Sequence, residues 1–293
     1  MKPCRSLSEI GKTKRINKLF NENGKTLIIP LDDNLISGPQ TKIERMDIKS
    51  KQIIDANPTA ILAYQGTLKT INEHIPTILN VTASTINSNH TNKVIISSVE
   101  NAIKLCADAV AVHINLSSIY ESRMLEIFGE ISSKCDSFGI PLMAIIYPRS
   151  EILNSDGKYS DFNYDDYRIN NQQKYADLVS HCVRVGYEIG ADIIKTHFTG
   201  SISSFKQVID SAVGVPVLIS GGNETNVRDL FIMTEQAIKA GASGACIGRN
   251  VFCRKDSGRM IRTLKKIIFE NISAQEAYNL YLIEKEGDYG NLE

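Results

Sequence analysis

The stretch that decides the fold is Gly190-Ala-Asp-Ile-Ile-Lys-Thr-His-Phe-Thr-Gly200. Its apolar pair, Ile193-Ile194, predicts a buried strand that carries Lys195 to its carboxyl end, where a polar, glycine-ended turn follows. Burial removes water from a lysine ammonium group and lowers its pKa, and the neutral amine is the form that attacks carbonyl carbons. Two interpretations stay open at this point: Lys195 is a nucleophile, or it reaches solvent or pairs with a nearby carboxylate such as Asp192.

The same pattern, an apolar run that ends in polar residues or glycine and is followed by a helical segment, recurs along the chain. The other seven runs are 26–34, 60–66, 77–84, 109–116, 141–148, 215–222 and 244–250. Eight strand-then-helix units without a domain-sized break predict an α/β fold, a single (β/α)₈ TIM barrel over residues 26–271. A leading helix is expected in residues 1–25, and an extra C-terminal helix with a tail in residues 272–293.

Residues 150–170, after the fifth strand, form a polar stretch rich in Asp, Ser and Tyr. Unstructured segments of this length are uncommon in compact domains and often serve as lids or binding loops. Two interpretations remain for it, a binding loop or a mobile surface insertion.

Composition narrows the class of protein. The 293 residues carry 33 basic and 33 acidic side chains and no tryptophan, so the net charge is zero. Balanced charge argues against nucleic acid or a membrane surface as a partner. The apolar runs are of strand length and the N-terminus lacks the apolar core of a signal peptide, so we expect a cytoplasmic protein.

The cysteines and histidines are scattered along the sequence. None of the six cysteines forms a CxxC pair, and the five histidines show no HxH or HExxH spacing. We therefore expect free thiols and no sequence-local metal site. If Lys195 is the nucleophile, its covalent Schiff base with the substrate makes a cofactor unnecessary, and we expect none.

Two late strand ends carry glycine, in Ser220-Gly221-Gly222 and in Gly248-Arg249. In (β/α)₈ barrels a phosphate group is frequently bound after strands seven and eight by backbone N–H groups, and glycine lets the backbone approach the anion closely. The guanidinium of Arg249 adds a charged donor. These five residues are predicted to bind substrate phosphate, although glycines at strand ends also serve tight turns alone.

Other polar residues fall at the same predicted mouth of the barrel. We expect substrate contacts from Thr199, Gly200, His113 and Asp33.

Three side chains complete a candidate Schiff-base site. Lys195 would attack a ketone and form an iminium ion, which withdraws electrons from the adjacent carbon–carbon bond. Tyr147 would move the proton of the hydroxyl that forms or is lost, and Asp32 would protonate the carbinolamine and orient the lysine. Taken singly, a strand-end tyrosine is more often packing, and Asp32 could simply pair with a neighbour.

Several motifs together resemble a known family. They are the opening stretch, Met143-Ala-Ile-Ile-Tyr-Pro-Arg149, Ala83-Ser-Thr, Ala109-Val-Ala-Val-His-Ile-Asn115 and Gly248-Arg-Asn-Val-Phe252. They resemble the class I, archaeal-type fructose-bisphosphate aldolases and the 2-amino-3,7-dideoxy-D-threo-hept-6-ulosonate synthase branch of that family. The resemblance implies a metal-independent lyase or transaldolase-like transferase that uses a Schiff base with dihydroxyacetone phosphate or a related keto-sugar phosphate.

By the same resemblance, Lys195 falls on the family's Schiff-base lysine, Tyr147 on its acid/base tyrosine and Asp32 on its strand-one aspartate. Many members are homo-oligomers, pentamers or decamers. The sequence departs from the family at Asp33-Asn34, where Asp-His-Gly is usual for residues 32–34, and this departure leaves the aldehyde substrate open.

The resemblance implies aspartate semialdehyde as the acceptor, in the biosynthesis of an aromatic or aminohydroxybenzoate-type precursor. The alternatives are a fructose-bisphosphate aldolase, a thiolase-like relative, and a catalytically inactive barrel that binds sugar phosphates.

Overall fold

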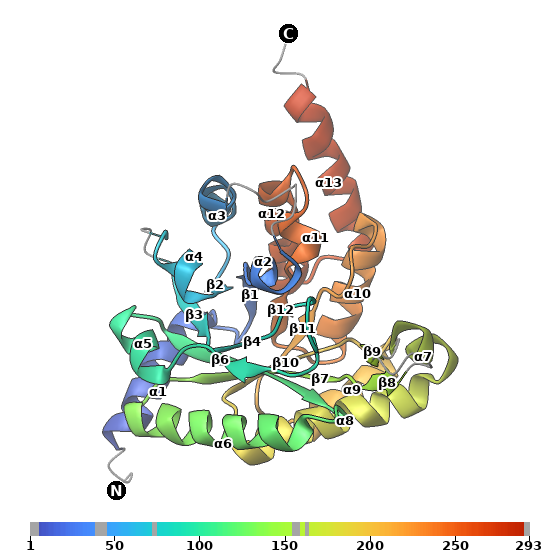
Figure 1. The fold of residues 1–293 in the computed structure, drawn as a ribbon. Helices are drawn as coiled ribbons and strands as arrows, with labels where there is room; N and C mark the ends of the chain where they lie inside the picture. The colour runs from blue at the N-terminus through green and yellow to red at the C-terminus, as the bar shows by residue number, and fades with distance from the viewer. Residues whose placement is uncertain (1–5, 39–45, 72–74, 154–158, 162–163, 290–293) are drawn as a thin grey trace, which may run out of the picture.

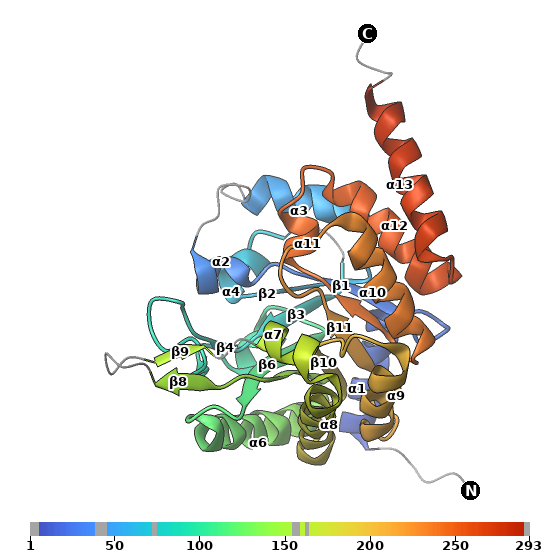
Figure 2. The same cartoon turned by 90° about the vertical axis from the view of Figure 1, so that its right-hand side faces the viewer.

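The computed structural model describes residues 6–38, 46–71, 75–153, 159–161 and 164–289. Its centre is a closed barrel of eight parallel strands, with helices around it (Figure 1, Figure 2). In order around the barrel the strands are β1 (Thr26–Pro30), β12 (Gly244–Cys246), β11 (Val217–Ser220), β10 (Ile193–Thr196), β7 (Leu142–Pro148), β6 (Ala109–Leu116), β3 (Thr77–Asn80) and β2 (Ala60–Ala63). The predicted (β/α)₈ fold is confirmed.

Helices connect most of the barrel strands, and α13 projects away from the barrel in both views (Figure 1, Figure 2). The helices are α1 (Leu7–Leu19), α2 (Asp33–Ser37), α3 (Met46–Asp55), α4 (Gln65–Leu68), α5 (Val99–Lys104), α6 (Glu121–Phe138), α7 (Tyr164–Asn170), α8 (Gln172–Ile189), α9 (Ile202–Ser211), α10 (Val227–Lys239), α11 (Arg249–Phe252), α12 (Ser257–Glu270) and α13 (Ala274–Tyr289).

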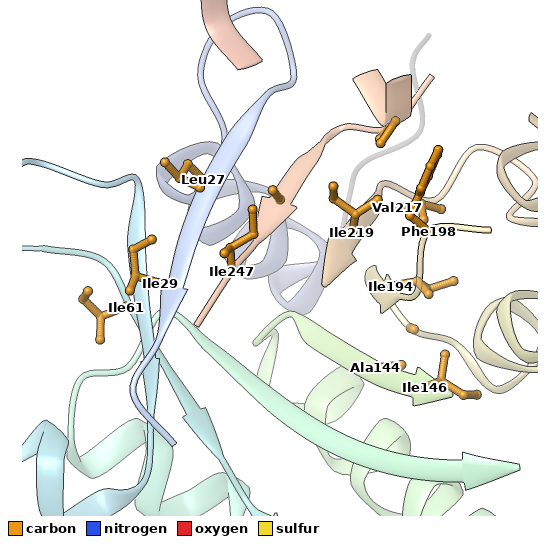
Figure 3. Close-up of a cluster of buried hydrophobic side chains, with 14 of the residues drawn as sticks. Leu27, Ile29, Ile61, Ala144, Ile146, Ile194, Phe198, Val217, Ile219 and Ile247 are labelled. Atoms are coloured by element: carbon orange, nitrogen blue, oxygen red, sulfur yellow. The ribbon is translucent and has the colours of Figure 1, made fainter. Parts of the chain in front are cut away.

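Side chains alternate between the two faces of each strand, as the β pleat requires. On β10, Ile193 and Lys195 belong to the inner face, and Ile194 packs outward against the helices. Outward-facing apolar side chains from many strands form one layer between the barrel and its helices, and Figure 3 shows part of it. The labelled members of that layer are Leu27, Ile29, Ile61, Ala144, Ile146, Ile194, Phe198, Val217, Ile219 and Ile247.

Helix α1 covers the amino ends of several strands. Lys12 lies between two carboxylates, with its Nζ 2.5 Å from Asp136 and 2.8 Å from Asp192. Asp192 Oδ2 also accepts a hydrogen bond of 2.8 Å from the backbone N–H of Leu142, at the start of β7. Asp192 is therefore part of the amino end of the barrel, and the interpretation that it pairs with Lys195 is wrong.

Residues 150–170 carry more regular structure than the expected loop. Strands β8 (Glu151–Leu153) and β9 (Tyr159–Asp161) pair antiparallel, and α7 follows. The Glu151 carboxylate fixes the start of this segment because it accepts hydrogen bonds from Ser118 Oγ at 2.6 Å and from the Ile119 N–H at 3.0 Å. Residues 154–158 and 162–163 lie outside the described part.

The structure also bears on the state of the cysteines and on membrane-spanning helices. The described cysteines are all free thiols, and Cys4 lies outside the described residues. Among the residues that the structure describes, no helix is both long enough and apolar enough to span a membrane.

Candidate active site at the carboxyl ends of the strands

The carboxyl ends of the barrel strands surround a cavity of about 350 Å³. Lys195, Tyr147 and Asp32 come from β10, from β7 and from the residues just after β1, and all three line this cavity. The predicted substrate-contact residues that also line it are His113, Asp33, Ser220, Gly221, Gly222, Gly248 and Arg249. Residues separated by up to 217 positions in the sequence therefore meet at one site.

Lys195 is buried, with 7% of its surface exposed, and its neighbours across the barrel wall are Ile145 and Leu218. Burial lowers the pKa of Lys195, whereas Cys246, Tyr147 and Asp32 raise it, and the net pKa lies above the ordinary value for lysine. The expectation that burial leaves Lys195 with a low pKa is therefore wrong. The resting lysine is an ammonium group and must lose a proton before it attacks a carbonyl.

The charge that stabilises this ammonium group near neutral pH comes from Asp32. A thiol or a phenol attracts a cation strongly only when it is ionised. Burial raises the pKa of Cys246 to about 11 and also raises the pKa of Tyr147, so both are neutral at pH 7. Asp32 in turn accepts a hydrogen bond of 3.0 Å from Asn80 Nδ2, and Asn80 is itself almost completely buried on β3.

The Tyr147 ring contacts two histidine rings. Its ring stacks on His197, with centroids 4.1 Å apart and planes 16° apart, and it meets the edge of His113 at 5.2 Å. The Ser220 hydroxyl lowers the pKa of the phenol but has no partner of good hydrogen-bond geometry among the described residues. Tyr147 is thus a neutral phenol whose ring contacts two histidine rings and which lines the same cavity as Lys195.

The predicted phosphate-binding residues form a close junction between β11 and β12. A Cβ atom on Gly221 would lie 2.8 Å from Ile247 Cγ2, and Gly222 has a φ of +65° that favours glycine. Arg249 Nη2 donates to the Gly222 carbonyl at 3.2 Å, so its guanidinium lies beside the glycines. Binding of a phosphate at this junction, by backbone N–H groups and the Arg249 guanidinium, stays a prediction.

Thr199 and Gly200 do not line the lysine cavity. They line a larger neighbouring cavity of about 890 Å³, which shares Arg149, His197 and the 220–223 segment with the first. Thr199 Oγ1 bonds to Ser204 Oγ at 2.8 Å in the turn before α9. Thr199 thus has a local contact with the first turn of α9, and substrate contact by Thr199 and Gly200 stays a prediction.

The sequence interpretation assigned no role to several residues that line the lysine cavity. His90, Arg149, His197 and Cys246 are all part of its wall. Arg149 Nη1 donates to His90 Nε2 at 2.7 Å, across 59 positions of sequence. Arg149 ends the Tyr-Pro-Arg motif, which was the available signal for it; the other three carried no pattern of their own.

The charges around the cavity favour an anionic ligand. Burial and the charges of Lys93, Arg149 and Arg249 lower the pKa of His90 to about 3, so this imidazole is neutral. Burial also raises the pKa of Asp33, although Arg249 opposes that shift. The cavity wall carries three cationic side chains, Lys195, Arg149 and Arg249, and two carboxyl groups, Asp32 and Asp33. The mouth of the barrel therefore attracts anionic groups such as phosphate.

A barrel with a buried lysine, a phenol and a carboxylate at the carboxyl ends of its strands defines a class, the lysine-dependent enzymes that act on carbonyl compounds. Within this class, residues 26–254 match the DeoC/LacD family of aldolases. The chain belongs to that family of class I, Schiff-base aldolases.

Two curated relatives are synthases. The chain is 32% identical to 2-amino-3,7-dideoxy-D-threo-hept-6-ulosonate synthase 1 of Archaeoglobus fulgidus over 284 residues, which cover 95% of this chain and 97% of the relative. It is 30% identical over 264 residues to 2-amino-4,5-dihydroxy-6-oxo-7-(phosphonooxy)heptanoate synthase of Streptomyces griseus, covering 88% and 90%.

Solved structures of archaeal fructose 1,6-bisphosphate aldolases are also similar. One matches with a TM-score of 0.76 at 26% identity and covers 88% of this chain and 99% of its own. Another, with the catalytic lysine covalently bound to a carbinolamine intermediate, matches with a TM-score of 0.75 at 26% identity and covers 87% and 98%.

Proposed function

We propose that the protein is a metal-independent class I aldolase in which Lys195 forms a Schiff base with dihydroxyacetone phosphate or a closely related phosphorylated ketone. The observation that carries this proposal is the meeting of Lys195, Tyr147 and Asp32 in one cavity beside the Gly221–Arg249 junction. The family supports the Schiff base, and the junction supports a phosphorylated donor.

The reaction begins with loss of a proton from the Lys195 ammonium group, for which Asp32 is the nearby anionic acceptor. The amine adds to the ketone carbon and gives a carbinolamine, which loses water to form the iminium ion. The Asp32 carboxylate, which has given its proton to the departing water, takes a proton from the adjacent carbon, and the electron pair moves to the iminium nitrogen to give an enamine. Lysine itself provides the electron sink, so no cofactor is needed for these steps.

The enamine carbon then attacks the aldehyde, and the new alkoxide takes a proton from Tyr147. The phenol suits this step because its raised pKa keeps it protonated at neutral pH. The proton held by Asp32 returns to the Tyr147 phenolate through solvent. Water then hydrolyses the resulting iminium ion to the ketose phosphate and the Lys195 ammonium group, its starting state. Cleavage of a ketose phosphate follows the same steps in reverse.

We propose aspartate semialdehyde as the aldehyde. The product named for the Streptomyces griseus relative is a seven-carbon chain with a 6-oxo group, a 7-phosphonooxy group and a 2-amino group. Breaking the bond between its carbons 4 and 5 gives dihydroxyacetone phosphate and the semialdehyde of aspartate. The product would be a precursor for aromatic or aminobenzoate biosynthesis, which is the role we propose here.

The second candidate is fructose-bisphosphate aldolase, favoured by the structural similarity to the archaeal enzymes. Each purified aldehyde, aspartate semialdehyde or glyceraldehyde 3-phosphate, is incubated with dihydroxyacetone phosphate, and the ketose product is identified by mass spectrometry. We expect turnover with aspartate semialdehyde to be the faster; preferential formation of fructose 1,6-bisphosphate would replace the first candidate by the second.

Trapping tests the Schiff base itself. Borohydride added with dihydroxyacetone phosphate should reduce the iminium ion and leave a stable adduct on Lys195, which peptide mass spectrometry locates. Lys195→Met is the matched negative control. A folded wild-type protein without an adduct would favour a catalytically inactive, sugar-phosphate-binding barrel, and an adduct without aldol product would favour a thiolase-like relative.

Metal independence has its own test. Among the described residues, no group of three His, Cys, Asp or Glu side chains is arranged to bind a metal ion. We expect EDTA or phenanthroline to leave the turnover rate unchanged; loss of activity restored by a divalent cation would contradict the proposal. We also propose a homo-oligomer, a pentamer or decamer, which light scattering or native mass spectrometry measures directly.

A further inference from the structure

A second tyrosine contacts the histidine that stacks on Tyr147. Tyr175 Oη lies 2.7 Å from His197 Nδ1, within hydrogen-bond distance. Tyr175 is on the first turn of α8, outside the barrel, and only 2% of its surface is exposed. His197 follows β10 directly and lies two residues after Lys195. A chain of contacts therefore runs from α8 through His197 to the ring of the proposed acid/base tyrosine.

His197 lines both cavities, whereas Tyr175 lines the larger cavity and is not among the residues of the smaller one. The Tyr147 ring also makes a T-shaped contact with His113, whose Nε2 lies 3.1 Å from Asn115 Oδ1. Each of the two histidines that contact Tyr147 is thus itself within hydrogen-bond distance of a polar side chain.

The His197 ring is uncharged at neutral pH. Burial lowers its pKa to about 3, and the positive charges of Arg149, Arg168, Lys195 and Arg249 act in the same direction. A neutral imidazole carries one N–H, so a phenol that donates to Nδ1 leaves the ring proton on Nε2. This arrangement fixes the orientation of the ring without adding a positive charge beside Tyr147.

We propose that Tyr175, acting through His197, is a positioning residue for Tyr147 in the aldol reaction. This inference rests on the proposed function. The hydrogen bond fixes the plane of the imidazole, and the stack fixes the plane of the phenol. The Tyr147 hydroxyl then stays aligned with the carbon–carbon bond-forming step at Lys195. Proton transfer depends steeply on such alignment, whereas attack by the lysine does not involve the orientation of the phenol.

The test compares Tyr175→Phe, His197→Phe and the double variant. Tyr175→Phe removes only the hydroxyl, and His197→Phe keeps a stacking ring but loses the nitrogen acceptor. We expect each single variant to lower kcat by about three- to tenfold, the factor that one hydrogen bond commonly contributes. The rate of borohydride trapping on Lys195 should change by less than about twofold, because that step does not use Tyr147.

The double variant decides whether the hydroxyl acts through the histidine. If it does, Tyr175→Phe should change kcat by less than about twofold once His197 is already Phe. Fully additive losses would overturn the proposal. Tyr281→Phe is the matched control, because Tyr281 is also buried, its hydroxyl donates to Asp256 at the start of α12, and it does not line the lysine cavity. Its kcat should equal that of the wild type.

A second readout does not depend on catalysis. In protein labelled with ¹³C-tyrosine, Tyr147→Phe identifies the Tyr147 signal, which the stacked ring of His197 displaces. Tyr175→Phe should move this signal, and the alkaline limb of kcat against pH should move to lower pH as water reaches the phenol. A fall in kcat with an unmoved signal would overturn the proposal. Absence of trapping in the wild type would overturn the proposed function, whereas the signal would still report whether the stack exists.

Discussion

The two ends of the barrel interior are built from the same strands but carry opposite kinds of side chain. On β10, Ile193 is fully buried in the apolar half, and Lys195, two residues later, lines the cavity. The same change occurs from Ile78 to Asn80 on β3 and from Leu218 to Ser220 on β11. Inward-facing positions recur every two residues along a strand. Two consecutive inward positions therefore differ in role: the first packs in the apolar core of the barrel, and the second lines the cavity.

The amino end is closed by apolar packing and by α1, with Leu19 among the inner side chains. The carboxyl end holds buried polar groups, and burying such groups costs free energy unless they are paired. We infer that apolar packing in the amino half stabilises the fold. This stabilisation offsets the free-energy cost of burying Lys195, Tyr147 and the histidines in the carboxyl half. Substitutions at the two ends should therefore affect different measurements.

The largest effect is expected at the carboxyl end. Lys195→Met removes the nucleophile and should lower kcat/KM by on the order of 10⁴-fold or more, because the group that forms the covalent intermediate is lost. Lys25→Met is the matched control, since Lys25 lies at the amino end of β1 and donates to the Ala242 carbonyl at 2.7 Å. Its kcat/KM, measured by the same product assay, should stay within about twofold of the wild type.

The reverse result is expected two residues earlier. Ile193→Ala leaves a cavity in the apolar amino half of the barrel and should reduce the free energy of unfolding by about 3 kcal/mol. Ile193→Val removes one methyl group and should reduce it by about 1 kcal/mol. Urea unfolding measures both values. Activity per folded molecule should be unchanged, and a loss of kcat in folded protein would show that the two halves are not separable.

The division between the halves also explains what the sequence predicted well. The eight strands are buried on both faces and read as short apolar runs, so periodicity and length were enough to find them. The ends of those runs then placed Lys195, Tyr147 and Asp32 at one mouth before any contact was known. The prediction of the site thus depended on topology.

Contacts between distant segments account for what the sequence did not predict. The β8–β9 hairpin is short and polar, and Glu151 fixes it to Ser118, 33 positions earlier. The pKa of Lys195 depends on neighbours from β7, from β12 and from the end of β1. A prediction from burial alone therefore gave the wrong direction for the shift of this pKa. Asp192 was a sequence neighbour of Lys195 but bonds at the opposite end of the barrel.

A pH titration distinguishes the two ends further. Burial lowers the pKa of His197 to about 3 in the folded protein, against about 6.5 in the unfolded chain. The unfolded chain therefore binds more protons between these values, and the stability held above pH 6.5 is lost as the pH falls. His197 should contribute about 2 kcal/mol to this loss at pH 5, which His197→Gln removes. His181→Gln, on the exposed face of α8, is the control in calorimetry at pH 5 and pH 7.

The smallest effect is expected at the amino end, where Lys12 joins α1 to Asp136 and Asp192. Lys12→Met should reduce the free energy of unfolding by about 1 kcal/mol, because Asp136 is exposed and exposed ion pairs contribute little. Asp192 keeps its hydrogen bond from the Leu142 N–H, which limits the loss further. Lys206→Met breaks only the exposed pair with Asp210, and it should cost less than about 0.5 kcal/mol in the same urea experiment. If Lys12→Met instead lowered kcat at unchanged stability, the amino end would influence the chemistry of Lys195 through β10, and the separation of the two halves would be wrong.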